Sequence, residues 1–156
     1  MKAIWMDSGK NISAEELNAQ GVTYLTLPTD EASYKGPLEG IMQKNGYVTM
    51  DQVKMWPEMP NFQALCDKFV GEHLHTDDEV RFVVGGSGVF EIRSQDDKWM
   101  KIIVEPTDFI SVPANRFHRF YLTDEKKIHC VRLFKDQSGW APHYRKDVEA
   151  AAAARG

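Results

Sequence analysis

Cysteine, long apolar runs and signal-like segments are scarce or missing in this sequence. Only two cysteines, Cys66 and Cys130, occur in 156 residues, and their spacing matches no metal-binding motif. Two reduced thiols are the simplest interpretation, which is typical of a cytoplasmic protein. No apolar run approaches the roughly 18 residues that a membrane span requires. The first ten residues, MKAIWMDSGK, also lack the apolar segment of a secretory signal. We therefore expect a cytoplasmic protein with no membrane partner.

The sequence also lacks a block of basic residues. It has 19 Lys and Arg against 23 Asp and Glu, so its formal net charge is −4. Proteins that bind nucleic acid neutralise phosphates with clustered lysine and arginine, and we expect no such partner here. The apolar fraction of 42% and the charged fraction of 27% are ordinary for a globular protein. This length predicts one domain, residues 1–156, that folds without disulfides.

Helix and strand signals alternate in about residues 1–70. Ser13 and Glu16 form a capping-box pattern, Pro37 suits the first turn of a helix, and Asp51 and Asn61 suit N-caps. The predicted helices cover residues 14–19, 34–45, 51–55 and 62–70, and the predicted strands cover residues 1–6 and 22–27. We expect these few helices to pack outside a barrel, and this half of the chain to cover one barrel end.

From residue 71 onward, short apolar strands alternate with turn signals. Segments rich in β-branched and aromatic residues are separated by turns such as GGSG at 85–88 and SQDDK at 94–98. The predicted strands cover residues 72–75, 79–84, 88–93, 99–104, 109–112, 117–122 and 128–134. Such spacing is typical of an antiparallel sandwich or barrel. We therefore predict a mainly β fold with its core at about 71–140 and a frayed or weakly helical tail at about 145–156.

The segment HLHTDDE holds the most informative polar residues. His73 and His75 point to the same face of a strand, whereas a helix would separate them by about 200°. Glu79 has the same odd parity and joins them if the chain turns at residues 76–78. Two imidazoles and a carboxylate suit iron, nickel, manganese or zinc, although an isolated histidine pair is more often just solvated. His118, in PANRFHRF, is the best candidate for a fourth ligand from another strand.

Alternation along the strands places further residues on that face. Alternate residues of a barrel strand point inward, so inward ligands predict an inward Arg81 and an inward Phe120. A buried guanidinium needs a partner, so Arg81 either pairs with an inner carboxylate or binds an anion, such as a planar enediolate with two oxygens. Phe120 forms either an apolar wall or ordinary core. Parity alone does not assign Arg132.

Two motifs resemble those of the cupin superfamily. HLHTDDE, followed after six residues by Gly86, resembles the first cupin motif, and Pro113 to His118 resembles the second. Within the cupins, the runs EHLHTDDEVRF, GSGVFEIR, DFISVPANRFHRF and VRLF, together with Trp140, resemble the acireductone dioxygenase family. This resemblance covers roughly residues 1–144. The positions that depart from the generic cupin motifs are Asp67, Thr107, Asn115 and Leu122. None of them is one of the four candidate ligands.

The resemblance implies a fold, a metal and a reaction. The fold would be a cupin-type antiparallel β-barrel, also called a double-stranded β-helix or jelly roll. His73, His75, Glu79 and His118 would bind one Fe(2+) or Ni(2+) per chain, and Arg132 would lie near the substrate. The substrate would be 1,2-dihydroxy-3-keto-5-methylthiopentene, the acireductone of methionine salvage, which O2 cleaves. Iron would yield formate and 4-methylthio-2-oxobutanoate, and nickel would yield formate, carbon monoxide and 3-methylthiopropanoate.

Several alternatives stay open at this level. The chain could be another cupin dioxygenase acting on a thiol or a flavonol, a metal-binding cupin without enzymatic activity, or, more weakly, a sugar-phosphate isomerase. Asp77 and Asp78 are either exposed turn acids or groups that orient a histidine, and the same holds for Glu72. We expect the partners to be a small-molecule enediolate and O2, and we expect a monomer.

Overall fold

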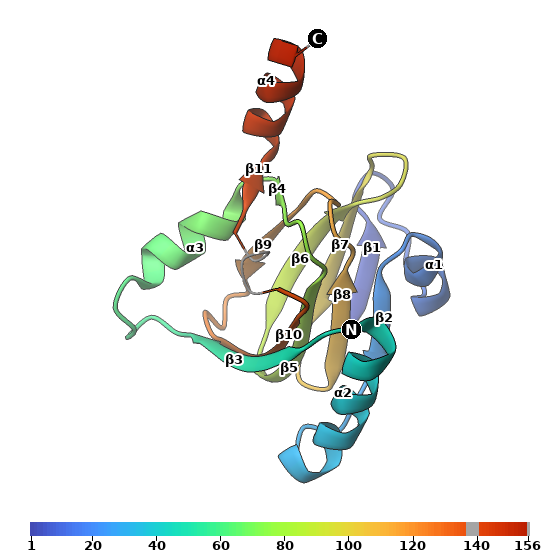
Figure 1. The fold of residues 1–156 in the computed structure, drawn as a ribbon, viewed down its shortest axis with the longest axis vertical. Coiled ribbons are helices and arrows are strands. Elements are labelled where there is room, and N and C mark those ends of the chain that lie inside the picture. The colour runs from blue at the N-terminus through green and yellow to red at the C-terminus, as the bar shows by residue number, and fades with distance from the viewer. Residues whose placement is uncertain (137–140, 156) are drawn as a thin grey trace.

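A computed structural model of the chain describes residues 1–136 and 141–155. Trp140, which contributed to the resemblance, lies outside these residues. Within them, the strands form two antiparallel sheets that face each other across one core (Figure 1). The six-stranded sheet has, in spatial order, β1 (Lys2–Trp5), β7 (Trp99–Val104), β6 (Gly88–Arg93), β9 (His118–Leu122), β4 (His73–Leu74) and β11 (His143–Tyr144). The five-stranded sheet has β2 (Thr23–Thr26), β8 (Asp108–Val112), β5 (Glu79–Gly86), β10 (Ile128–Phe134) and β3 (Thr49–Met55). The predicted mainly β, antiparallel architecture is confirmed.

Four helices connect or flank these strands in the part of the chain that is described: α1 (Ala14–Ala19), α2 (Glu31–Asn45), α3 (Phe62–Val70) and α4 (Arg145–Arg155). The predicted capping box of Ser13 and Glu16 is present at α1. In Figure 1, α4 extends away from the sheets, and α3 lies beside the end of the barrel at which β4 and β9 meet. None of these helices is both long and apolar enough to cross a membrane.

Strand alternation directs the residues of β5 to two different surroundings. Val80 and Phe82 point outward and pack with Tyr34 and Leu38 of α2 in a second hydrophobic cluster. Glu79 and Arg81 point to the opposite side and line an internal cavity. A period of two along a strand produces this division directly. It confirms the inward direction that parity predicted for Arg81.

Two of the predicted helices are wrong in type or extent. Residues 51–55 form part of strand β3, not a helix, because every residue from Thr49 to Met55 pairs with a residue of β10. This long-range pairing outweighs the local N-cap signal of Asp51. Helix α2 begins at Glu31, not at residue 34, since the Asp30 side chain accepts a hydrogen bond from the Ser33 backbone N–H. Pro37 therefore lies inside the helix instead of in its first turn.

Helix α3 has the predicted bounds, but its N-cap residue does not act as predicted. Asn61 occupies the N-cap position in a left-handed conformation, with φ of 64°, and its side chain makes no capping hydrogen bond. Asparagine is one of the few residues that adopt this conformation readily. Asn115, which replaces a motif glycine, is left-handed in the same way, with φ of 65°. The turn that leads to His118 therefore survives without glycine.

Candidate active site

The four predicted metal ligands come from three strands and meet at one point. His73 lies on β4 directly opposite His118 of β9 in the sheet register, His75 follows β4, and Glu79 begins β5. The ligand-type nitrogens of the three histidines lie within 4.8 Å of one another. Glu79 joins them, with Oε1 3.8 Å from His75 Nε2 and Oε2 2.6 Å from His118 Nε2. All four side chains are buried.

Backbone carbonyl groups orient the three imidazoles. His73 Nδ1 lies 2.6 Å from the Gly71 carbonyl oxygen, and His118 Nδ1 lies 2.9 Å from that of Arg116. His75 Nδ1 lies 3.2 Å from the carbonyl oxygen of Ala141. A carbonyl oxygen only accepts, so each Nδ1 must carry the proton and donate it. Each Nε2 is then left with a lone pair that points toward the common centre, which is the tautomer a metal ligand needs.

Four buried atoms at this centre have no hydrogen-bond partner in the part of the chain that is described. Within residues 1–136 and 141–155, the buried side-chain atoms without a partner are Nε2 of His73, His75 and His118 and Oε2 of Glu79. The short contact between Glu79 and His118 joins two acceptors when the proton is on Nδ1. Such a cluster of buried acceptors is costly unless a cation or a further proton lies among them. The residues therefore fit a bound divalent metal ion.

The protonation states of His73, His75 and Glu79 at neutral pH are those that metal binding requires. Burial, with the nearby His118 second, lowers the pKa of His73 to about 4. Burial also lowers the pKa of His75, against the opposing influence of Glu79. Burial by itself would raise the pKa of Glu79, but Arg81 and His118 outweigh it and hold this pKa well below its usual range. Neutral imidazoles and an ionised carboxylate need no deprotonation before a metal binds.

Asp77 and Asp78 anchor the loop between His75 and Glu79. The Asp77 carboxylate accepts hydrogen bonds from the backbone N–H groups of Asp78, Lys135 and Asp136. The Asp78 carboxylate accepts from the Tyr47 hydroxyl at 2.7 Å and from the Ala114 backbone N–H at 2.9 Å. These two acids therefore bind backbone and tyrosine groups, whereas carbonyl oxygens hold the three histidines. They connect the loop of residues 76–78 to Tyr47, to Ala114 and to the segment that follows β10.

Glu72, next to His73, takes part in a surface ion-pair cluster. Its carboxylate accepts hydrogen bonds from Arg93 at 3.0 Å and from Arg145 at 2.7 Å. Burial raises the pKa of Glu72, but the two arginines outweigh this effect and lower it. Glu72 therefore links β6 and α4 and, like the two aspartates, has no hydrogen bond to a histidine.

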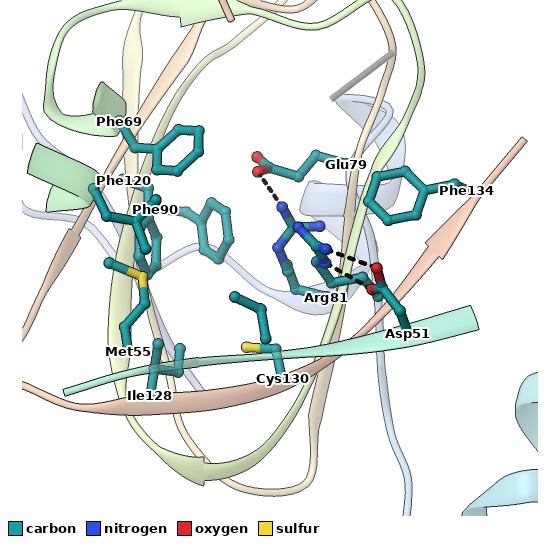
Figure 2. Close-up of a pocket in the computed structure, with 13 residues that line it drawn as sticks. Asp51, Met55, Phe69, Glu79, Arg81, Phe90, Phe120, Ile128, Cys130 and Phe134 are labelled. Atoms are coloured by element: carbon teal, nitrogen blue, oxygen red, sulfur yellow. Dashed lines mark hydrogen bonds and ion pairs between the residues drawn. The ribbon is translucent and has the colours of Figure 1, made fainter. Parts of the chain in front are cut away.

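A cavity of about 380 Å³ adjoins this centre at Glu79 and has a polar and an apolar part. The polar part is formed by Asp51, Glu79, Arg81 and Arg132. Figure 2 shows the first three of them. The remaining lining residues are Val53, Met55, Leu65, Phe69, Phe90, Phe120, Ile128, Cys130 and Phe134. The three residues predicted to contact the substrate, Arg81, Phe120 and Arg132, all line this cavity. Its size is in the range of small-molecule sites.

The two arginines of the cavity are neighbours with different partners. Arg81 of β5 and Arg132 of β10 are directly opposite each other in the sheet register. Arg81 donates from Nη2 to Glu79 Oε1 at 2.9 Å and from Nη1 to the Val80 carbonyl oxygen at 3.0 Å. Arg132 donates from Nε and Nη2 to the two carboxylate oxygens of Asp51, both at 2.7 Å. Of the two alternatives predicted for Arg81, the pairing with an inner carboxylate is therefore present. Arg81 also faces the cavity, and its binding of an anion stays a prediction.

Asp51, Phe69 and Cys130 are among the lining residues that the sequence did not predict as parts of the site. Asp51 was predicted to cap a helix, and Phe69 belongs to the helix predicted for residues 62–70. The ring of Phe69 lies 5.8 Å from that of His73. Cys130 was left as an ordinary thiol; burial raises its pKa to about 12, so it stays protonated. Cys130 and Arg132 are two residues apart on β10 and therefore point to the same face of the strand, which was the one local signal for the direction of the Cys130 side chain.

Comparisons with known proteins agree with this geometry. Residues 5–142 match the sequence model of the ARD/ARD' family. The chain is 42% identical over 142 residues to an acireductone dioxygenase of Heterostelium pallidum, which covers 91% of this chain and 96% of that protein. It is 40% identical over 143 residues to the acireductone dioxygenase of Dictyostelium discoideum, covering 91% and 97%.

A solved structure shows the same fold. Acireductone dioxygenase from Bacillus anthracis, determined with a cadmium ion in its active center, superposes with a TM-score of 0.86 at 28% identity. The match covers 92% of this chain and 97% of that one. The resemblance to the acireductone dioxygenase family and the antiparallel β-barrel that it implied are confirmed. On its sequence, its fold and its cluster of three histidines, this chain belongs to the ARD/ARD' family.

Proposed function

We propose that this protein is an acireductone dioxygenase, which cleaves an enediol substrate with O2 at a divalent metal held by His73, His75, Glu79 and His118. The observation that carries the proposal is the set of four buried ligand atoms without hydrogen-bond partners, beside a cavity that holds two guanidinium groups. The metal, when bound, would act as a Lewis acid and a template for the two substrate oxygens. Everything else in the site concerns how the protein binds and orients the substrate.

The charges of the site favour an anionic substrate. Arg81 and Arg132 balance the carboxylates of Glu79 and Asp51, and an imidazole that binds a metal does so in its neutral form, so a bound divalent cation would leave a net double positive charge. An enediolate carries the negative charge that such a site attracts. Its adjacent oxygens also suit the planar, forked donors of a guanidinium. We therefore assign Arg81 and Arg132 to substrate binding.

The apolar part of the cavity suits the rest of the acireductone. Phe69, Phe90 and Phe120 lie together on the side of the cavity away from Asp51 (Figure 2). The rings of Phe90 and Phe120 are in contact, with centroids 4.9 Å apart. Aromatic and aliphatic walls exclude water and bind an unbranched thioether chain by burying its apolar surface. We propose that Phe120 is the wall against which the methylthio end of the substrate packs.

Oxygen uptake by the purified, metal-loaded protein tests the function. The metal content is measured first, the protein is mixed anaerobically with acireductone, and O2 is then admitted. Rapid uptake with formate release is the expected result. Formation of carbon monoxide with nickel but not with iron would establish the product pattern that we propose for each metal. Bound metal with no uptake of O2 would contradict the function and leave a metal-binding cupin, whereas uptake only with thiols or flavonols would indicate a different dioxygenase.

Three other parts of the hypothesis need measurements of their own. One Fe(2+) or Ni(2+) per chain, a monomeric state and a cytoplasmic location stay predictions. Three imidazoles and one carboxylate can bind several divalent metals. The affinities of these metals follow the same order at most sites of this kind, so the ligand set does not identify the metal. Metal analysis of protein from cells grown with iron or nickel in excess, together with size-exclusion chromatography, addresses the first two.

A further inference from the structure

Asp51 is placed to control the position of Arg132. The two residues are directly opposite each other on β3 and β10, and their side chains meet in a bidentate ion pair, with both distances 2.7 Å. On its other side, Arg132 is directly opposite Arg81 of β5. A row of three charged residues, Asp51, Arg132 and Arg81, therefore runs across three strands along one wall of the cavity.

Arg132 needs such a partner because its neighbour has the same charge. Like charges directly opposite each other on adjacent strands repel, and Arg81 is already bound by Glu79 and the Val80 carbonyl group. The Arg132 side chain is 20% exposed, so solvent offers it an alternative position. The Asp51 carboxylate opposes this movement by binding Nε and Nη2. Nη1 of Arg132 makes no hydrogen bond to any residue that the structure describes, and it stays available to a ligand.

We infer that Asp51 is the positioning residue for Arg132: its carboxylate holds the guanidinium beside Arg81, so that the cavity offers two adjacent cations to one anionic substrate. The inference rests on the proposed function, which it deepens. It also gives a role to strand β3, which comes from the half of the chain expected to be only a cover. Asp51 acts through Arg132, so its loss should weaken binding of substrate and leave metal binding unaltered.

A double-mutant cycle tests the coupling. The variants are Asp51→Asn, Arg132→Ala and the double variant, each loaded with metal and assayed for steady-state O2 uptake. The matched control is Gln52→Ala, because Gln52 lies on the same strand and links β3 to β10 on the other face, through His129 at 2.7 Å. Metal content and melting temperature are measured for every variant. Anaerobic titration with substrate reports binding without turnover.

The expected pattern is specific to a positioning role. Loss of a hydrogen bond to a charged group should raise KM by roughly 10- to 100-fold in Arg132→Ala. In Asp51→Asn the Arg132 side chain is still present but held less firmly, so KM should rise by about 5- to 20-fold. The turnover number kcat should change less than about threefold, since Arg132 contacts the bound substrate in the ground state as well as in the transition state. The double variant should match Arg132→Ala within about twofold. Gln52→Ala should match the unmodified enzyme, and all variants should keep full metal content.

Three results would overturn the inference. These are multiplicative effects in the double variant, an unchanged KM in Asp51→Asn, or an unchanged KM in Arg132→Ala. If Asp51→Asn does not fold, Asp51→Glu keeps the charge but moves the carboxylate by one methylene; it should raise KM measurably, and a normal KM would contradict the inference. Absence of O2 uptake by the unmodified enzyme is a distinct failure, because it would overturn the proposed function itself and the inference with it.

Discussion

Loss of the metal from the three histidines and Glu79 should destabilise the folded protein strongly. The metal-free site buries four acceptor atoms without hydrogen-bond partners, and each such group costs about 1–3 kcal/mol. A metal present at about 1,000 times its Kd stabilises the folded state by about 4 kcal/mol. In a domain of this size 1 kcal/mol changes Tm by about 2–4 °C. We therefore expect metal-free protein to melt about 8–16 °C below the loaded form.

Differential scanning calorimetry measures this difference directly. The protein is treated with a chelator, dialysed and compared with samples reconstituted with Ni(2+) or Fe(2+), the latter without oxygen. His75→Ala should abolish tight metal binding and with it the metal-dependent rise in Tm. The exposed His143 lies on β11 beside β4 and offers a matched control; His143→Ala should keep the full rise. A difference below about 2 °C between loaded and metal-free protein, or a full rise in His75→Ala, would refute the ligand assignment.

Three further predictions concern stability and the shape of the cavity. In the metal-free protein, the pKa of His73 is about 4 in the folded state and about 6.5 in the unfolded state. Between these two pH values the unfolded state binds more protons, so the folded state loses stability as the pH falls. Urea denaturation at pH 4 should therefore show a free energy of unfolding about 3 kcal/mol lower than at pH 7. Gly88→Ala would place a Cβ 2.6 Å from the Phe120 ring, so we expect urea denaturation to show a free energy of unfolding lower by about 1–3 kcal/mol. Displacement of Phe120 should also raise KM more for acireductones with a long tail than for those with a short tail. An equal rise in KM for both would contradict the assignment of Phe120 to the tail. Asp77→Ala removes the acceptor of the Lys135 and Asp136 backbone N–H groups and should lower the free energy of unfolding by about 1–3 kcal/mol. Hydrogen exchange should become faster at the backbone amides of these two residues alone. Unchanged exchange there would contradict the role of Asp77 as their anchor.

The candidate metal centre was foreseen from short-range patterns in the sequence. His73, His75 and Glu79 lie within seven residues, and a period of two predicts their common face without knowledge of the rest of the chain. The same alternation predicted the inward direction of Arg81, two residues after Glu79. The strands from residue 79 to residue 134 were predicted almost to the residue, because β-branched runs bounded by turns are local signals.

The opposite wall of the cavity could not be foreseen in this way. Asp51 lies 81 residues from Arg132 in the chain, and nothing near it in sequence indicates that partner. Its N-cap signal predicted a helix for residues 51–55, whereas pairing with β10 along the whole segment made them a strand. Phe69 likewise lies in a segment predicted as a helix, and a helix prediction does not say what the helix packs against.

Local chemistry was therefore enough to predict the common face of His73, His75 and Glu79, the mainly β class and the inward face of β5. Spacings of two to six residues carry that information, because a strand repeats every two residues wherever it lies. The tertiary structure alone decided that His118 faces His73, that Arg132 stands between Asp51 and Arg81, and that aromatic side chains close the apolar part of the cavity. Those contacts depend on which strands pair and in which register, and the free energy of that choice comes from packing across the whole chain.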